Sequence, residues 1–332
     1  MTQLVGTCRA HANIALIKYW GKKDEELFIP MNSSLSLTLA ALYTDTRVSF
    51  DSALTEDHFY LDGVKQRAEE VLKLTQFLDL FRQKAGSTAK ACVESYNHVP
   101  TAAGLASSAS AYAALAGACR DALALDLSDS ELSTFARRGS GSATRSIFGG
   151  FVKWEKGQDH SSSRAYPLPV SAFNYSMVIA LVNAGKKAMS SRAGMAHTRK
   201  TSPYYTLWPR TAEKQCQALE RALAAEDFMR VGEIMESNAM RMHATMLASD
   251  PVLSYFEPGT MEVIQAVQKM RAAGISAYYT MDAGPNVKIL CQKKDQGKVV
   301  SSLKDFLAPK RIIPTEAGPG IHSLEAWPYE KH

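Results

Sequence analysis

The sequence predicts a two-domain fold that mixes strands and helices, and three observations support this class. The chain has 332 residues, more than one hydrophobic core usually serves. Its first half interleaves strand-like and helix-like patterns of apolar residues. From about Gly185 onward, long helical patterns dominate. We therefore expect an N-terminal domain over residues 1–185 and a C-terminal domain over residues 186–332.

The elements of the first half follow from periodicity and turn residues. Leucines alternate with hydroxyl residues over 34–39, which is the period of a half-buried strand. The Asp-Gly pair at 62–63 indicates a hairpin turn, and Gly86 ends a helical stripe. Ser128 and Glu131 match a capping box. The predicted order is strand 34–39, strand 46–51, hairpin 58–66, helix 66–84, strand 89–99, a helix to about 125, a short helix after 128 and a strand at 149–155.

The second half begins after a polar, proline-bearing stretch at 157–170, which indicates a surface connection. A buried strand is expected at 175–184. The elements expected after it are helices around 187–200, 209–225, 227–248 and 260–272, strands near 277–291, a helix at 295–306 and a strand at 311–317.

Composition is that of an ordinary globular protein, with 46% hydrophobic and 21% charged residues. The net charge of +5 indicates either a solvated surface or a basic pocket for an anionic small molecule. The absence of a basic block argues against nucleic-acid binding. The longest apolar run, 177–182, is too short to span a membrane, and no signal-peptide core is evident. Five scattered cysteines without a C-x-x-C pair predict a reduced, cytoplasmic protein and argue against zinc.

The stretch PTAAGLASSASAYAAL, residues 100–115, is the first candidate for chemistry. Gly104 permits backbone conformations closed to other residues, and Ser107 and Ser108 precede a helical stripe. A helix N-terminus offers unpaired N–H groups and partial positive charge, which suit a phosphate. The stretch lacks the Walker A pattern. It also matches a small-residue helix packed tightly on a sheet.

Three further motifs combine cations, hydroxyls or an acid. NIALIKYWGKKDEE, residues 13–26, places lysines around an aromatic pair, although lysines at a strand end can be plain surface charge. RRGSGSATRS, residues 137–146, offers either a flexible linker or an anion site with the planar fork of Arg145. In YYTMDAGPNVKIL, residues 278–290, Asp282 is either a turn-capping residue or an acid aimed into a cleft.

The motifs KYWGK, PTAAGLASSASA, SGSATRS, KKAMSSRAGM and MDAGPNV occur in this order. So arranged, nearly the full chain resembles the mevalonate diphosphate decarboxylase family, within the galactokinase–homoserine kinase–mevalonate kinase–phosphomevalonate kinase superfamily. The resemblance implies an α+β two-domain small-molecule-kinase superfamily fold with the active site in the inter-domain cleft. It also implies the ATP-dependent decarboxylation of mevalonate 5-diphosphate to isopentenyl diphosphate in isoprenoid biosynthesis. ADP, phosphate and carbon dioxide are released, after phosphorylation of the 3-hydroxyl.

The resemblance further implies residue roles. Asp282 is expected to be the general base at the 3-hydroxyl, Lys18 to keep it ionised, and Arg145 to hold the substrate carboxylate. The residues expected to bind substrate are Tyr19, Trp20, Gly21, Lys22, Lys73, Ser140, Gly141, Ser142, Ala143, Thr144, Arg145, Ser191 and Arg192. Those expected to bind ATP are Gly104, Leu105, Ala106, Ser107, Ser108, Ala109 and Lys187. Mg²⁺ is expected to arrive with ATP, without an assigned protein ligand, and a cytoplasmic homodimer is expected.

Two other functions compete with this interpretation. One is a kinase of the same superfamily that acts on mevalonate or phosphomevalonate without decarboxylation. The other is a non-catalytic protein that senses nucleotides or isoprenoid intermediates. The joint presence of Asp282, Lys18 and Arg145 argues against both. A nucleic-acid-binding role rests on net charge alone.

Overall fold

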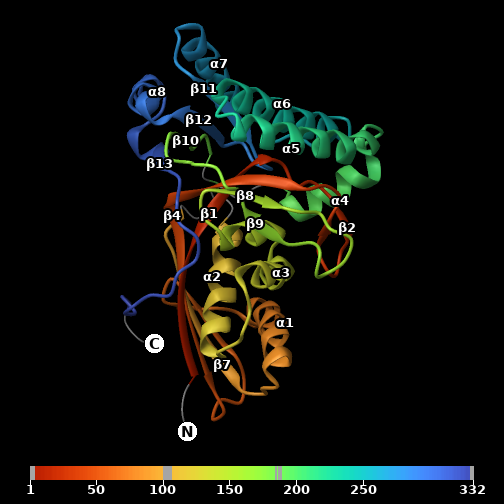
Figure 1. The fold of residues 1–332 in the computed structure, drawn as a ribbon, viewed down its shortest axis with the longest axis vertical. Coiled ribbons are helices and arrows are strands. Elements are labelled where there is room, and N and C mark those ends of the chain that lie inside the picture. The colour runs from red at the N-terminus through yellow and green to blue at the C-terminus, as the bar shows by residue number, and fades with distance from the viewer. Residues whose placement is uncertain (1–3, 100–106, 184, 186–188, 330–332) are drawn as a thin grey trace.

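The computed structural model describes residues 4–99, 107–183, 185 and 189–329 (Figure 1). The first half of the chain is built on a mixed sheet ordered β6-β5-β7-β4-β8-β9, with β1 paired to β4. Its strands are β1 (Leu4–Ile17), β4 (Ser34–Asp51), β5 (His58–Leu61), β6 (Val64–Lys65), β7 (Lys90–Asn97), β8 (Phe151–Trp154) and β9 (Ala165–Pro167). A small hairpin, β2 (Lys22–Asp24) with β3 (Ile29–Pro30), stands apart from it.

The long strand β4 joins the two strands predicted at 34–39 and 46–51. The prediction that its first part is half-buried is wrong, because both faces are buried. On the hydroxyl face, Ser34 accepts a hydrogen bond from Arg145 at 2.6 Å, and Thr38 donates one to the Phe148 carbonyl at 2.8 Å. The segment after residue 140 covers this face and bonds to the hydroxyls of Ser34 and Thr38, so the polar alternation marks an internal contact.

The helices α1 (Ala68–Ala85), α2 (Ser107–Ala122) and α3 (Asp129–Gly139) cover the first sheet where the sequence predicts them. The 3-10 helix η1 (Gly141–Ile147) forms where the sequence predicts a loop. Ser128 and Glu131 form the predicted capping box, and Gly86 ends α1 in the left-handed region with φ of 65°. The small residues of α2 pack closely on β1 and β4, within a core that includes Ala113, Val48 and Phe50. This close packing places the start of α2 at the edge of the sheet.

A second, antiparallel sheet ordered β11-β12-β10-β13 organises the rest of the chain. Its strands are β10 (Tyr175–Ala180), β11 (Ala277–Met281), β12 (Val287–Gln292) and β13 (Ile312–Glu316). The helices and 3-10 helices of this half are α4 (Ser191–Thr201), η2 (Tyr205–Leu207), α5 (Trp208–Ala224), α6 (Phe228–Leu247), α7 (Pro258–Ala272), η3 (Lys293–Asp295), α8 (Gln296–Lys304) and η4 (Pro309–Arg311). Strand β10 precedes residue 185 yet belongs to this sheet. The division at 185 stays a prediction.

One hydrophobic cluster joins the two halves. It brings Leu16 and Leu35 of the first sheet against Met177 of the second, with Cys216 of α5 and Met235 of α6. Burial of such side chains is worth roughly 1.5–3 kcal/mol each. The two halves therefore share a hydrophobic core. This shared core fixes the position of one half relative to the other.

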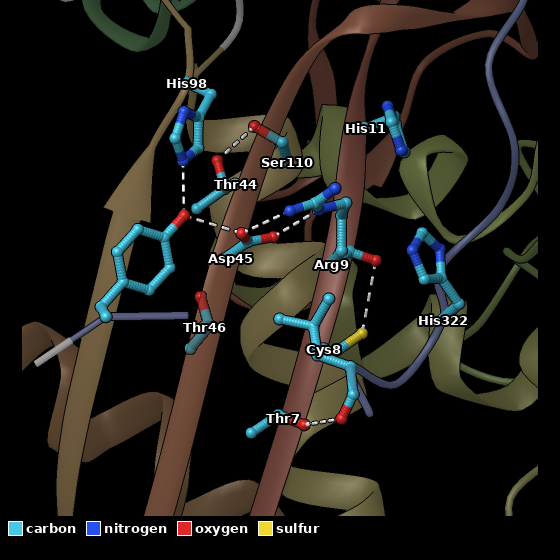
Figure 2. Close-up of polar contacts among 12 residues, drawn as sticks. Thr7, Cys8, Arg9, His11, Thr44, Asp45, Thr46, His98, Ser110 and His322 are labelled. Carbon is cyan, nitrogen blue, oxygen red and sulfur yellow. Dashed lines mark hydrogen bonds and ion pairs between the residues drawn. The ribbon is translucent and has the colours of Figure 1, made fainter. Parts of the chain in front are cut away.

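After β13 the chain returns to the first sheet (Figure 1). We call residues 317–329 the C-terminal strap. Its His322 exchanges two backbone hydrogen bonds with Arg9 of β1. Further along, the Tyr329 hydroxyl donates to Asp45 of β4 at 2.8 Å and contacts the His98 ring nitrogen at 2.5 Å. Asp45 also accepts two hydrogen bonds of 2.7 Å from Arg9, as Figure 2 shows.

Two other predictions concern disulfide bonds and membrane-spanning helices. All five cysteines fall within the described residues, where none forms a disulfide. Among the described helices, none combines the length and apolar character needed to cross a membrane. The region predicted as a surface connection, 157–170, contains the short strand β9, which pairs with β8.

Candidate active site

A cavity of about 720 Å³ gathers residues from both halves of the chain. The end of β1, the start of α2, η1, the start of α4, the middle of α6 and the turn after β11 all contribute side chains. The predicted residues that line it are Lys18, Tyr19, Trp20, Lys22, Ser107, Ser108, Ser140, Gly141, Ser142, Arg145, Ser191, Arg192 and Asp282. Its lining includes four cationic side chains and one carboxylate, so the cavity favours a polyanion.

Asp282 is the carboxylate of this cavity, and two buried lysines hold it. Lys18 Nζ donates a hydrogen bond of 2.8 Å to Oδ1, and it also donates to the Ala15 carbonyl at 2.8 Å. Lys288 Nζ lies 3.0 Å from Oδ2 as an ion pair. The Asp282 side chain is 26% exposed, whereas the two lysine side chains are 1–2% exposed. The acid therefore faces the cavity, with Lys18 beside it in the lining and Lys288 buried outside the lining.

The ionisation of this trio follows from burial and charge. Burial alone raises the pKa of the Asp282 carboxyl, but Lys18 and Lys288 outweigh it and hold that pKa well below its usual range. Burial lowers the pKa of Lys18 to about 8, even though Asp282 opposes the shift. His243 of α6 lies nearby, and burial lowers its pKa to about 4, so it stays neutral near pH 7. The carboxylate is thus charged near pH 7.

Arg145 of η1 supplies a cation at the same cavity. Its Nε donates to Asn13 Oδ1 at 3.2 Å and its Nη1 to Ser34 at 2.6 Å, so β1 and β4 fix its plane. Burial lowers its pKa to about 10, which leaves it protonated at neutral pH. Within the described residues, it forms no ion pair. A buried guanidinium without its own carboxylate is suited to the carboxylate of a bound ligand.

The segment around Arg145 is an ordered 3-10 helix, which removes the flexible-linker alternative. A chain of hydroxyl contacts runs from Ser108 at the start of α2 to Ser140 and on to Ser142, each 3.1 Å long. Gly141 lies against the Tyr19 ring, where an added Cβ would approach a ring carbon to 2.6 Å. The start of α2 and η1 therefore present one continuous surface of hydroxyl groups to the cavity.

Two cations meet on one aromatic ring at the opposite wall. Lys22 Nζ lies 3.8 Å from the centre of the Phe28 ring, and the Arg192 guanidinium lies 5.0 Å from it. Arg192 stands in the first turn of α4, whose N-cap is Ser190. A helix N-terminus beside two cations is a strong position for a phosphate group.

The remaining predicted residues lie elsewhere. Gly104, Leu105, Ala106 and Lys187 fall outside the described residues. Ala109, Ala143 and Thr144 are buried behind the lining, and Gly21 packs where an added Cβ would meet the Tyr205 hydroxyl at 1.6 Å. Lys73 is on the exposed face of α1, where it pairs with Glu69 at 2.7 Å. These five support or flank the site without lining it, and a binding role for Lys73 stays a prediction.

Several residues of the site were not predicted. Lys288, His243 and Asn13 contact or neighbour the charged groups, and Phe28 carries two cations. The signal for Asn13 was a polar residue inside an apolar strand. Lys288 stood within a quoted motif, but one lysine in a strand is also typical of a solvent-facing position. Its role depends on the register of β11 and β12.

Comparisons with known proteins agree with this geometry. Residues 10–165 match the diphosphomevalonate decarboxylase-like N-terminal domain, and residues 177–324 match the mevalonate 5-diphosphate decarboxylase C-terminal domain. The diphosphomevalonate decarboxylase of Candida albicans is 35% identical over 94% of this chain and 95% of its own.

Solved structures resemble the whole chain. The mevalonate diphosphate decarboxylase from Enterococcus faecalis is 49% identical with a TM-score of 0.93, over 98% of this chain and 100% of its own. Another solved chain with the same identity, coverage and TM-score is described as MDDEF in complex with MVAPP, AMPPCP and magnesium. The similarity covers both halves of the molecule and so includes every segment that contributes to the cavity.

Proposed function

The chain belongs to the diphosphomevalonate decarboxylase family, and from this premise we propose how its own residues carry out the reaction. The enzyme catalyses the ATP-dependent decarboxylation of mevalonate 5-diphosphate. The observation that carries the assignment of roles is the placement of Asp282 between two buried lysines, in the cavity that Arg145 also lines. An acid and a cation in one cavity can address the 3-hydroxyl and the carboxylate of one substrate.

Substrate binding uses the basic and hydroxyl walls of the cavity. We assign the diphosphate to Tyr19, Lys22 and Arg192, with hydroxyls of Ser140, Ser142 and Ser191. The support is that Lys22 and Arg192 converge on Phe28 beside the start of α4. The substrate carboxylate goes to Arg145, whose guanidinium offers a charged fork.

The chemistry has two stages. The 3-hydroxyl oxygen bonds to the γ-phosphorus of ATP, the bond to ADP breaks, and Asp282 takes the hydroxyl proton. The C3–O bond then breaks, and phosphate leaves with that electron pair. The bond to the carboxylate breaks as carbon dioxide departs, and its electrons form the alkene. Lys18 balances the Asp282 charge in the first stage, and Arg145 orients the carboxylate for loss in the second.

The nucleotide is assigned to the wall formed by the start of α2. Ser107 and Ser108 line the cavity there, and the predicted residues Gly104, Leu105, Ala106 and Lys187 lie outside the described residues. ATP is the co-substrate and Mg²⁺ the cofactor. In the described residues, no three His, Cys, Asp or Glu side chains gather to hold a metal. Magnesium commonly binds substrate phosphates with few protein ligands, and the Ser107 and Ser108 hydroxyls would join them. When bound, it neutralises phosphate charge.

The test follows the carboxyl carbon. Purified protein is incubated with ATP, Mg²⁺ and mevalonate 5-diphosphate labelled in its carboxylate, and ADP and labelled carbon dioxide are measured together. Equal amounts of both are expected. ADP without carbon dioxide or alkene would instead indicate the kinase alternative, and binding without turnover would indicate the sensor alternative.

We also propose a homodimer and a cytoplasmic location. Both rest on the family resemblance, and the second also on the unpaired cysteines. Light scattering at micromolar protein should give twice the mass of the 36.3 kDa chain. Cell fractionation should recover the activity with cytoplasmic markers.

A further inference from the structure

Lys288 is the second buried cation beside Asp282, which already forms an ion pair with Lys18. Asp282 is the carboxylate with which it forms an ion pair among the described residues, and its side chain is 1% exposed. A structural ion pair needs one cation for one carboxylate, because each buried charge costs several kcal/mol of desolvation. Two lysines on one aspartate leave an excess positive charge, which suggests a purpose other than stability.

The two oxygens of Asp282 are held differently. Lys18 is aligned as a hydrogen-bond donor to Oδ1. Oδ2 is buried and, within the described residues, accepts no aligned hydrogen bond, although Lys288 Nζ lies 3.0 Å from it. Since Oδ2 is hidden and the side chain is still 26% exposed, the exposed surface belongs to the other atoms of the side chain.

The fold explains how Lys288 reaches this position. Thr280 of β11 lies opposite Lys288 of β12, and Asp282 follows two residues later on the same face. Asp282 and Lys288 are therefore diagonal neighbours across the strand pair, within reach of a long side chain. Lys288 also donates a hydrogen bond to the Asn286 carbonyl at 3.2 Å, which fixes its ammonium group.

We propose that Lys288 is a positioning residue that pins Oδ2 of Asp282 inside the protein, so that Oδ1 is presented to the 3-hydroxyl of the substrate. This inference rests on the proposed role of Asp282. Lys18 then serves the oxygen that takes the proton, and Lys288 fixes the direction in which that oxygen points. The charged and titratable groups around Asp282 are Lys18 after β1, Lys288 on β12, His243 on α6 and Arg145 on η1.

The test is Lys288→Met, which removes the charge and keeps the length of the side chain. We expect kcat to fall about 10- to 100-fold, since misplacement of a reacting group by ~1 Å can cost on the order of 100-fold. KM for mevalonate 5-diphosphate should stay within about threefold, because the diphosphate-binding residues are untouched. The acid limb of the kcat–pH profile should move to higher pH, because Asp282 loses one cation. A kcat within twofold of the wild type, with an unmoved profile, would overturn the proposal.

Two further variants keep the test decisive. Lys293→Met is the matched control, because Lys293 also pairs with a carboxylate, Glu316 at 2.8 Å, but on the exposed surface just after β12. It should leave kcat and the pH profile unchanged. Lys288→Arg keeps a cation of different shape, and its kcat should lie between those of Lys288→Met and the wild type. If Lys288→Met does not fold, Lys288→Gln takes its place, and wild-type kcat with an unmoved pH profile in that variant contradicts the proposal.

Asp282→Asn separates this inference from the proposed function. If Asp282→Asn is inactive while Lys288→Met matches the wild type, the positioning role fails and the role of Asp282 stands. If Asp282→Asn keeps its activity, the proposed function of the acid fails first.

Discussion

Asp45 and Asp282 both pair with cations, but of these two only Asp282 lines the cavity of the candidate site. Asp45, under the C-terminal strap, has no exposed side-chain surface and takes two hydrogen bonds from Arg9 and one from Tyr329. Asp282 is 26% exposed and forms ion pairs with two lysines, at 2.8 Å and 3.0 Å. At Asp45 both oxygens accept hydrogen bonds, whereas at Asp282 only Oδ1 accepts an aligned one from the described residues.

The difference shows how to separate a structural carboxylate from a catalytic one. Burial and a strong ionic partner are common to both. What distinguishes Asp282 is that its partners are single-point ammonium groups, which leave part of its side chain exposed to a ligand in the cavity. At Asp45, the fork of Arg9 and the Tyr329 hydroxyl donate to both carboxylate oxygens, and no exposed surface of the side chain remains for a ligand.

The largest expected effect is the loss of catalytic activity when Asp282 is replaced. Asp282→Asn should lower kcat by about 10²- to 10⁴-fold, the range typical of general acid–base catalysis. Binding of mevalonate 5-diphosphate, measured by calorimetry, should stay mostly intact because the diphosphate contacts lie elsewhere in the cavity. Unchanged turnover would remove Asp282 from catalysis.

The same substitution at Asp45, beneath the strap, should lower the stability of the fold and leave activity unchanged. Asp45→Asn removes the charge that Arg9 and Tyr329 surround, and we expect a loss of roughly 3 kcal/mol in the free energy of unfolding, because Arg9 is still partly in water. Urea denaturation measures this loss, and kcat at 25 °C should be that of the wild type. A large fall in kcat without loss of stability would break the comparison.

A smaller effect is expected where a neutral hydroxyl meets ATP. Ser107→Ala should raise KM for ATP by roughly 2- to 10-fold, the value of one ordinary hydrogen bond, and should change mevalonate 5-diphosphate binding less. Ser302→Ala on α8 is the control, since that hydroxyl only donates to the Lys298 carbonyl. A larger change in substrate binding than in nucleotide use would contradict the phosphate role of α2.

The smallest effect is in pH dependence, and its sign differs between activity and stability. Because burial lowers the pKa of Lys18 to about 8, kcat should fall above that pH as Asp282 loses a charged partner. The unfolded chain keeps the Lys18 proton to its ordinary value of 10.5, so this group makes the fold more stable as pH rises from 8 to 10.5. The strap should add no such limb near pH 8, because hydrogen bonding to Asp45 raises the pKa of Arg9. Rate and urea profiles measured over pH 7–10 check both signs.

Local patterns in the sequence predicted most elements in their correct order. The Ser128–Glu131 capping box and the Gly86 helix end were confirmed because they depend on neighbours in the chain. The burial of Ser34 was not predictable in this way, because alternation assumes that the polar face meets water and cannot reveal η1 above it. Only the resemblance to a known family connected Lys18, Arg145 and Asp282, since no periodicity joins residues so distant in the chain. Lys288 escaped both approaches because strand register decides its partner.

The strap also sets an order for the synthesis of the protein. A ribosome delivers Arg9 and Asp45 early, but Tyr329 lies 284 residues after Asp45. A nascent chain can form most of the first sheet before Tyr329 has been made, but the buried carboxylate of Asp45 then lacks one donor. Completion of the first sheet is thereby tied to the strap, and co-translational folding of this half can reach its final state only after the strap has emerged.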